Sequence, residues 1–142
     1  MIRIIVLDDD YEAYNTLKIF IDQFSKENNI GFEINYFSNP LSFLDDYTPA
    51  DLILMDIDMP YLNGIETAEK LRSKDPNVLL IFITNYVQYA IKGYSVNAID
   101  YVLKPVKYAR FSSLMSRVLK MIIASKNDNI IIKTTDGTIT HL

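Results

Sequence analysis

The middle of the chain reads LILMDIDMP from Leu52 to Pro60. Apolar residues fill its first half and are followed at once by a carboxylate, Asp56. A short apolar run bounded by polar residues is typical of a strand buried on both faces of a parallel sheet. The proline, with Gly64 a few residues later, predicts a well-defined turn after that strand. The stretch therefore predicts an inner strand that presents Asp56 at its carboxyl end.

Other apolar runs in the chain also end in polar residues. They are Ile4–Leu7 before Asp8 and Asp9, Leu79–Ile83 before Thr84, and Tyr101–Leu103 before Lys104. In open parallel sheets the ligand site lies outside the carboxyl ends of the strands, so these side chains should converge. Carboxylate oxygens suit a divalent cation such as magnesium, and a lysine with a threonine suits the oxygens of a phosphoryl group.

Strand-like and helix-like patterns alternate along residues 2–125. The expected strands are Ile2–Leu7, Phe32–Phe37, Asp51–Met55, Val78–Ile83 and Asp100–Leu103. The expected helices cover Tyr14–Phe24, Pro40–Asp45, Ile65–Leu71, Val87–Tyr94 and Phe111–Ile122. This alternation predicts an α/β fold, a flavodoxin-like doubly wound parallel sheet of order 2-1-3-4-5 with helices on both faces. Its switch point lies between the first and third strands, which carry the acidic residues.

Composition excludes several classes of function. The net charge is −4 and lysines and arginines form no run, which argues against this segment binding nucleic acid by itself. Without cysteine the chain has no disulfides or thiolate metal sites, and its single histidine, His141, leaves little room for histidine-based catalysis. No signal peptide or membrane-spanning stretch is visible, so we expect a cytoplasmic protein without membrane contact.

The last residues of the chain do not follow the alternating pattern. Lys126–Asn129 has the polar character of a linker, and Ile130–Thr134 and Thr138–Leu142 flank the dipeptide Asp136-Gly137. Such a dipeptide between apolar runs is typical of a two-residue hairpin. The sequence therefore predicts one domain over residues 1–125, followed by a linker and a hairpin over residues 126–142.

Each candidate site residue also has a plain structural interpretation. Acids after a strand often cap the next helix, a threonine at a strand end is usually a turn hydroxyl, and a lone lysine is usually solvated. Their joint placement at the predicted strand ends favours a shared site. The Lys104–Pro105 peptide, directly after a strand, can adopt the cis form.

With these residues the chain resembles the receiver domain of two-component response regulators over residues 2–125. The motifs are Asp8-Asp9, Leu54–Pro60 with Gly64, Thr84, and Tyr101–Pro105. Tyr89-Ala90 and Asn97–Tyr101 further resemble the LytTR (LytR/AlgR) class, in which a receiver precedes an all-β DNA-binding domain. The hairpin predicted at residues 130–142 resembles the start of that second domain.

The resemblance implies a role for each acidic residue. Asp56 would accept a phosphoryl group from a sensor histidine kinase. Asp9, Asp56 and the backbone carbonyl of Asp58 would bind magnesium, and Asp8 would take part partly through water. Asp58 departs from the wider family, where an uncharged residue is frequent, and its carboxylate would tune dephosphorylation in either direction.

The resemblance also implies a switch. Lys104 and Thr84 would each bind a phosphoryl oxygen, and Tyr101 would then rotate inward. The remodelled surface of the fourth helix, fifth strand and fifth helix would favour a homodimer, and DNA would be bound only through the missing C-terminal domain.

Two alternatives remain open at this point. Asp56-Ile57-Asp58 after an apolar strand also resembles the nucleophile motif of haloacid-dehalogenase-type phosphatases, which would make the protein a magnesium-dependent enzyme. Against this, the acid pair here precedes the nucleophile and the chain has no room for a cap domain. A receiver that acts only as a non-phosphorylated interaction module is disfavoured by the intact set of site residues.

Overall fold

A computed structural model of the protein describes residues 1–86, 88, 92 and 95–135, with the backbone alone described for 127–135. Its strands are β1 (Ile2–Leu7), β2 (Phe32–Phe37), β3 (Leu52–Met55), β4 (Leu79–Thr84) and β5 (Asp100–Leu103). They form one parallel five-stranded sheet of order β2-β1-β3-β4-β5. The predicted fold class and strand order are confirmed, and the carboxyl ends of β1 and β3 lie side by side.

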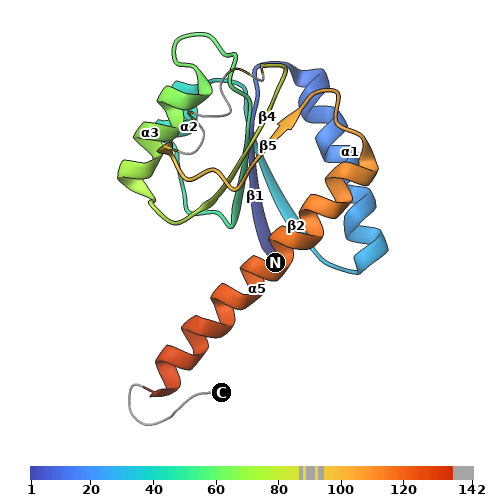
Figure 1. The fold of residues 1–142 in the computed structure, drawn as a ribbon, viewed down its shortest axis with the longest axis vertical. Coiled ribbons are helices and arrows are strands. Elements are labelled where there is room, and N and C mark those ends of the chain that lie inside the picture. The colour runs from blue at the N-terminus through green and yellow to red at the C-terminus, as the bar shows by residue number, and fades with distance from the viewer. Residues whose placement is uncertain (87, 89–91, 93–94, 136–142) are drawn as a thin grey trace. The chain divides into compact units, whose positions relative to one another are not determined.

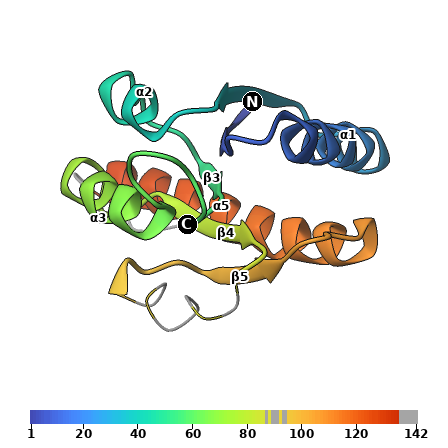
Figure 2. The same cartoon turned by 90° about the horizontal axis from the view of Figure 1, so that it is seen from above.

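Helices cover both faces of this sheet. α2 (Pro40–Asp45) and α3 (Gly64–Lys74) lie on one face, and α1 (Tyr11–Asn28) lies on the other (Figures 1 and 2). α1, α2 and α3 each begin at a side-chain cap: Asp10 accepts the N–H of Glu12, Asn39 accepts that of Leu41, and Asn63 forms a reciprocal capping box with Glu66. These caps satisfy backbone donors that have no partner within the helix. They fix where each helix starts relative to the strand before it.

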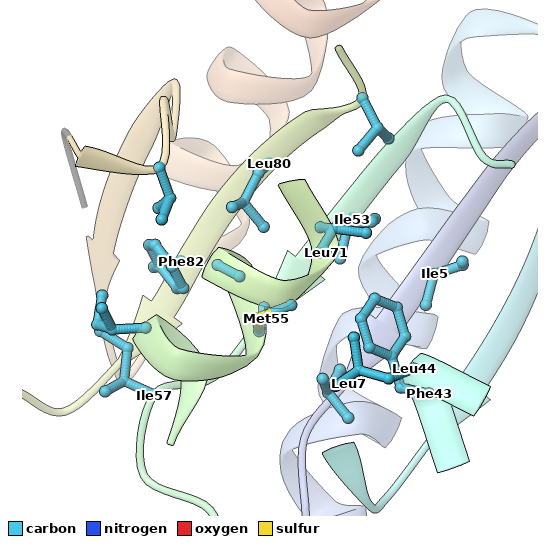
Figure 3. Close-up of a cluster of buried hydrophobic side chains, with 14 of the residues drawn as sticks. Ile5, Leu7, Phe43, Leu44, Ile53, Met55, Ile57, Leu71, Leu80 and Phe82 are labelled. Atoms are coloured by element: carbon cyan, nitrogen blue, oxygen red, sulfur yellow. The ribbon is translucent and has the colours of Figure 1, made fainter. Parts of the chain in front are cut away.

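The face of the sheet under α2 and α3 is filled by a continuous apolar cluster. Ile53 and Met55 of β3 are in register with Leu80 and Phe82 of β4, so their side chains share a face. Figure 3 shows Leu71 of α3 beside Ile53, and Phe43 of α2 with Leu44, Ile5 and Leu7 in the same cluster. All of them are almost fully buried. Burial of this kind holds the strands rigid and therefore fixes the residues at their carboxyl ends.

The predicted fourth helix, Val87–Tyr94, lies mostly outside the described residues. The chain divides into two compact units, Met1–Tyr108 and Ala109–Leu142. The last described helix, α5, spans Tyr108–Thr135. Within residues 1–86, 88, 92 and 95–135, no helix combines the length and the apolar character that crossing a membrane requires.

The helix α5 corrects one part of the sequence prediction. It continues through Lys126–Asn129, expected as a linker, and through Ile130–Thr134, expected as the first strand of a hairpin. The chain contains no glycine or proline between Tyr108 and Thr135 to end the helix. A lone hairpin is at best marginally stable in water, whereas helix continuation satisfies the backbone locally. Thr138–Leu142, the expected second strand, lies outside the described residues, and the domain boundary remains a prediction.

Candidate functional site

The strand ends bring the predicted site residues together. Asp8 follows β1, Asp56 follows β3, and Thr84 is the last residue of β4. These three side chains are buried, with exposed fractions of 2%, 6% and 0%, although all are polar. Asp9, by contrast, is exposed. Polar groups are seldom buried without a compensating interaction. The burial of these side chains therefore indicates a functional site rather than a contribution to the apolar core.

The three carboxylates lie close enough to share one cation. Asp8, Asp9 and Asp56 can each supply one oxygen such that all of these atoms lie within 4.8 Å of one another. Hard cations such as magnesium bind carboxylate oxygens, and one or two such ligands are commonly completed by water. The donor set therefore fits the magnesium ion that the sequence predicted.

Lys104, directly after β5, joins two of these carboxylates. Its Nζ donates to Asp8 Oδ2 at 2.8 Å and to Asp56 Oδ2 at 3.1 Å. Burial by itself lowers the pKa of the Lys104 amino group, but the hydrogen bond and charge of Asp8 and the charge of Asp56 outweigh it, so that the pKa is raised. Lys104 therefore stays an ammonium and lies beside the carboxylate of Asp56. The Lys104–Pro105 peptide is cis.

Asp8 is the most strongly perturbed acid. Burial raises the pKa of its carboxyl to about 6, with the nearby charge of Asp56 adding to the rise and hydrogen bonds from Lys104 and the Asp10 N–H opposing it. Desolvation and the charge of Asp56 also raise the pKa of Asp9. Asp8 and Asp9 thus bind protons more tightly than isolated aspartates do. A divalent cation would relieve the same repulsion.

The loop after Asp56 holds its backbone tightly. The Asp56 N–H donates to the Leu7 carbonyl at 2.9 Å, and the Gly64 N–H donates to the Ile57 carbonyl at 2.7 Å. A Cβ on Gly64 would lie 2.2 Å from the Asp56 carbonyl oxygen, closer than any real contact. The turn between them includes Tyr61 at φ 73°, with the Leu62 N–H bonded to the Pro60 carbonyl at 2.9 Å. Only glycine at position 64 therefore lets α3 start this close to Asp56.

Thr84 and Tyr101 occupy the side of the site nearest β5. The Thr84 hydroxyl accepts the N–H of Tyr86 at 3.4 Å. Tyr101 is half-buried, packs against the apolar cluster, and has its ring centroid 6.3 Å from that of Phe82. The structure thus places Thr84 at the end of β4 and Tyr101 on the neighbouring strand β5, and their roles as switch residues remain predictions.

Two tyrosine hydroxyl contacts were not predicted from the sequence. The Tyr86 hydroxyl donates to Asp58 Oδ2 at 3.2 Å, and this hydrogen bond is exposed to solvent. The Tyr36 hydroxyl donates to the backbone carbonyl of Asp8 at 2.8 Å. The available signal for Tyr36 was its place one residue before the end of β2, beside the strand that carries Asp8.

An apolar cleft opens next to Lys104. It is lined by residues of α1, β4 and the segment after β5: Glu12, Ala13, Thr16, Leu17, Ile83, Asn85, Lys104, Pro105 and Val106. The surface that lines it is mostly apolar, and its polar groups come from Glu12, Thr16, Asn85 and Lys104. The cluster of acids and this cleft share the Lys104 side chain.

Comparison with known proteins identifies similar chains. Residues 4–118 match the family described as "Response regulator receiver domain". The "Sensory transduction protein LytT" of Oceanobacillus iheyensis is 38% identical over 88 residues, which are 61% of this chain and 35% of that protein. The chain spans only 34% to 56% of the length of such curated relatives.

Solved structures show the same fold. The response regulatory domain of mrkE from Klebsiella pneumoniae aligns with a TM-score of 0.78 at 23% identity, covering 87% of this chain and 99% of that one. The response regulator TrrA from Thermotoga maritima, solved in complex with Mg(2+)-BeF, aligns with a TM-score of 0.69 at 27% identity and covers 83% of this chain and 99% of that one.

Proposed function

The chain belongs to the family of response regulator receiver domains, and on that premise we propose that Asp56 is its phosphorylation site. In this proposal Asp56 accepts the phosphoryl group of a phosphohistidine on a sensor histidine kinase. A carboxylate oxygen of Asp56 forms the new bond to phosphorus, the bond from phosphorus to the imidazole nitrogen breaks, and the nitrogen keeps the electron pair. The product is an acyl phosphate. The protein then acts as a signalling switch that promotes its own phosphorylation and dephosphorylation.

One observation carries this proposal. Lys104 Nζ lies within hydrogen-bond distance of Asp56 Oδ2 and Asp8 Oδ2. The ammonium is therefore in place to bind an oxygen of a phosphoryl group that arrives on Asp56. Asp56 follows β3, which lies between β1 and β4, and its carboxylate lies close to Asp8, Asp9 and Lys104. A fixed positive charge of this kind stabilises developing negative charge without having to reorganise.

The proposed cofactor is magnesium. Asp9 and Asp56 would bind it directly, Asp8 partly through water, and the backbone carbonyl of Asp58 would complete the protein ligands. Bound magnesium would neutralise the phosphoryl oxygens and the acid cluster during transfer. The relative TrrA, 27% identical, was solved with Mg(2+)-BeF, which supports the same type of ligand here.

The switch is proposed to pass through Thr84 and Tyr101. A phosphoryl oxygen on Asp56 would accept a hydrogen bond from the Thr84 hydroxyl, and this would draw the residues after β4 towards the site. Because Tyr101 packs beside Phe82 of β4, a change there would alter its environment. A local electrostatic event of this kind biases a two-state element.

The output is proposed to be transcriptional. The LytT relative is named a sensory transduction protein, and the chain spans about a third of it, so a DNA-binding domain of the LytTR type beyond residues 126–142 would supply DNA contact. Phosphorylation would favour a homodimer and would take place in the cytoplasm, beside the kinase. Sedimentation with and without beryllofluoride tests the dimer: tighter self-association is expected with it, and an unaltered monomer would count against it.

Mass spectrometry after incubation with acetyl phosphate tests the proposed function. With magnesium, the intact mass should rise by one phosphoryl group, and EDTA should prevent the rise because the acids repel the anionic donor. Sustained release of phosphate over many turnovers would instead favour the phosphatase alternative. No labelling under any condition would favour the pure interaction module.

A further inference from the structure

We infer that Tyr36 is a positioning residue for the proposed magnesium site, acting through the backbone carbonyl of Asp8. The inference rests on the proposed function, because it concerns the ion that Asp8, Asp9 and Asp56 would hold. Its physical content is a single hydrogen bond: the Tyr36 hydroxyl donates to the Asp8 carbonyl at 2.8 Å.

That hydrogen bond fixes the peptide group that carries Asp9. The Asp8 carbonyl and the Asp9 N–H belong to one planar unit, so an anchor on the oxygen sets the direction in which the Asp9 backbone leaves the loop. Asp8 itself is held in other ways: its N–H donates to the Phe37 carbonyl at 3.1 Å and its carboxylate accepts from Lys104. Asp9 is exposed, so its direction depends chiefly on the backbone that bears it.

The Tyr36 ring is itself held by α1. Tyr14 stacks on it with ring centroids 4.0 Å apart and an interplanar angle of 12°, and Tyr11 meets it edge-on at 6.1 Å. Both partners stand at the start of α1, whose cap is Asp10 of the same loop. The aromatic stack therefore limits the freedom of the Tyr36 side chain, and the hydroxyl is presented at a fixed place.

Groups that orient metal ligands affect metal affinity even though they do not touch the ion. Without the Tyr36 hydroxyl, the Asp8–Asp9 peptide would lose an anchor and Asp9 would sample more directions. The acids would then be less well arranged for one cation. The expected effect is a magnesium affinity about three- to tenfold weaker, the range of a single net hydrogen bond.

Thermal melting over a series of magnesium concentrations tests the inference on Tyr36→Phe, with Tyr14→Phe as the matched control. Each variant removes one hydroxyl from the same stack, but only Tyr36→Phe removes the bond to Asp8. A merely structural role would lower the melting temperature equally at every magnesium concentration. A positioning role should move the magnesium concentration of half-maximal stabilisation upward by about three- to tenfold in Tyr36→Phe and leave it unchanged in Tyr14→Phe.

The outcomes separate the inference from the proposed function. If the wild-type protein gains no stability from magnesium, the proposed metal site fails and the inference with it. If the wild type responds and Tyr36→Phe responds with the same half-maximal concentration, only the inference is overturned. Should Tyr36→Phe not fold, nuclear magnetic resonance of the wild type decides: the Tyr36 ring protons should shift with the same magnesium dependence as the Asp9 amide, and an unresponsive ring would overturn the inference.

Discussion

Among single residues, Asp8 sets the electrostatic character of the site. It is almost fully buried, yet it must remain close to two other carboxylates and the Lys104 ammonium. Its burial favours the neutral carboxyl, while Lys104 favours the charged one. The balance places the pKa of Asp8 at about 6. This value is close enough to neutral pH for protons and metal cations to compete for the Asp8 carboxylate.

This pKa predicts a pH dependence of stability in the absence of metal. Because the pKa of Asp8 is higher in the folded state than in the unfolded chain, the folded state binds more protons between about pH 4 and pH 6. The free energy of unfolding should therefore fall as pH rises through this window, by on the order of 3 kcal/mol from this residue. In EDTA, denaturant titrations at several pH values should show a smaller fall in Asp8→Asn. Equal slopes in both proteins would contradict the assignment.

A second prediction at this scale concerns Asp58, whose carboxylate accepts the Tyr86 hydroxyl beside the site. A carboxylate near the acyl phosphate can take a proton from attacking water, so Asp58→Asn should lengthen the acyl-phosphate half-life severalfold, well short of the ~100-fold that a positioned general base supplies. Tyr86→Phe frees the carboxylate and should shorten the half-life. Half-lives within error of the parent in both variants would remove Asp58 from the dephosphorylation step.

The residues that form the site could be predicted from the sequence, but some of the hydrogen bonds around them could not. Asp56 and Lys104 each follow an apolar strand directly, so parallel topology alone brings them together. The contacts of Tyr36 and Tyr86 depend on how far a long side chain reaches across neighbouring strands or loops. Strand and helix periodicity contains no information on that reach, and a tyrosine in such a place is by default a packing residue.

At the scale of elements, the close approach of α3 to the end of β3 determines the position of Asp56. Gly64 opens α3 directly against the Asp56 carbonyl, and its N–H bonds to the Ile57 carbonyl. Arg72, two turns later, donates through its guanidinium to the carbonyls of Val78 and Val96 at 2.7 Å each. The start of α3 is thus tied to the end of β3, and its last turns are tied to the residues that precede β4 and β5.

Gly64→Ala should therefore damage both stability and phosphorylation. The added Cβ would meet the Asp56 carbonyl oxygen at 2.2 Å, and the backbone of Asp56 or α3 must move. Overpacking of this kind costs about 1–3 kcal/mol, and a displaced Asp56 should be labelled more slowly. The matched control is Gly31→Ala, whose Cβ would find its nearest neighbour, the Met1 side chain, at 3.5 Å. If both variants melt and label alike, the close approach at Gly64 does not matter.

Element boundaries were predictable where the sequence changes character abruptly. Strands β1, β2 and β5 have the predicted bounds because polar residues or turn signals follow their apolar runs. The end of α5 was mispredicted because Ile130–Thr134 is compatible with either state: β-branched residues favour a strand, yet no helix-ending residue precedes them. For such a segment the partner that it packs on decides, and local sequence does not show that partner.

At the scale of the whole molecule, the boundary near residue 125 can be tested by truncation. The five strands and their site residues all precede Tyr108, and the family match ends at residue 118. Ending the chain after Lys126 should lower the free energy of unfolding by no more than about 1 kcal/mol, which corresponds to 2–8 °C for domains of this size. The melting temperature should therefore stay within a few degrees of the parent. Acetyl phosphate labelling of Asp56 should also be unchanged. A large loss of melting temperature would show that residues 127–142 are integral to the receiver.

The central claim is that one carboxylate in this molecule, Asp56, carries the phosphoryl group. The most direct measurement is the intact mass of three proteins after incubation with acetyl phosphate and magnesium: the wild type, Asp56→Asn and the neighbouring control Asp58→Asn. The wild type and Asp58→Asn should each gain one phosphoryl group, and Asp56→Asn should gain none, because Asp58 is exposed at the rim while Asp56 lies against Lys104. Undiminished labelling of Asp56→Asn would contradict the account.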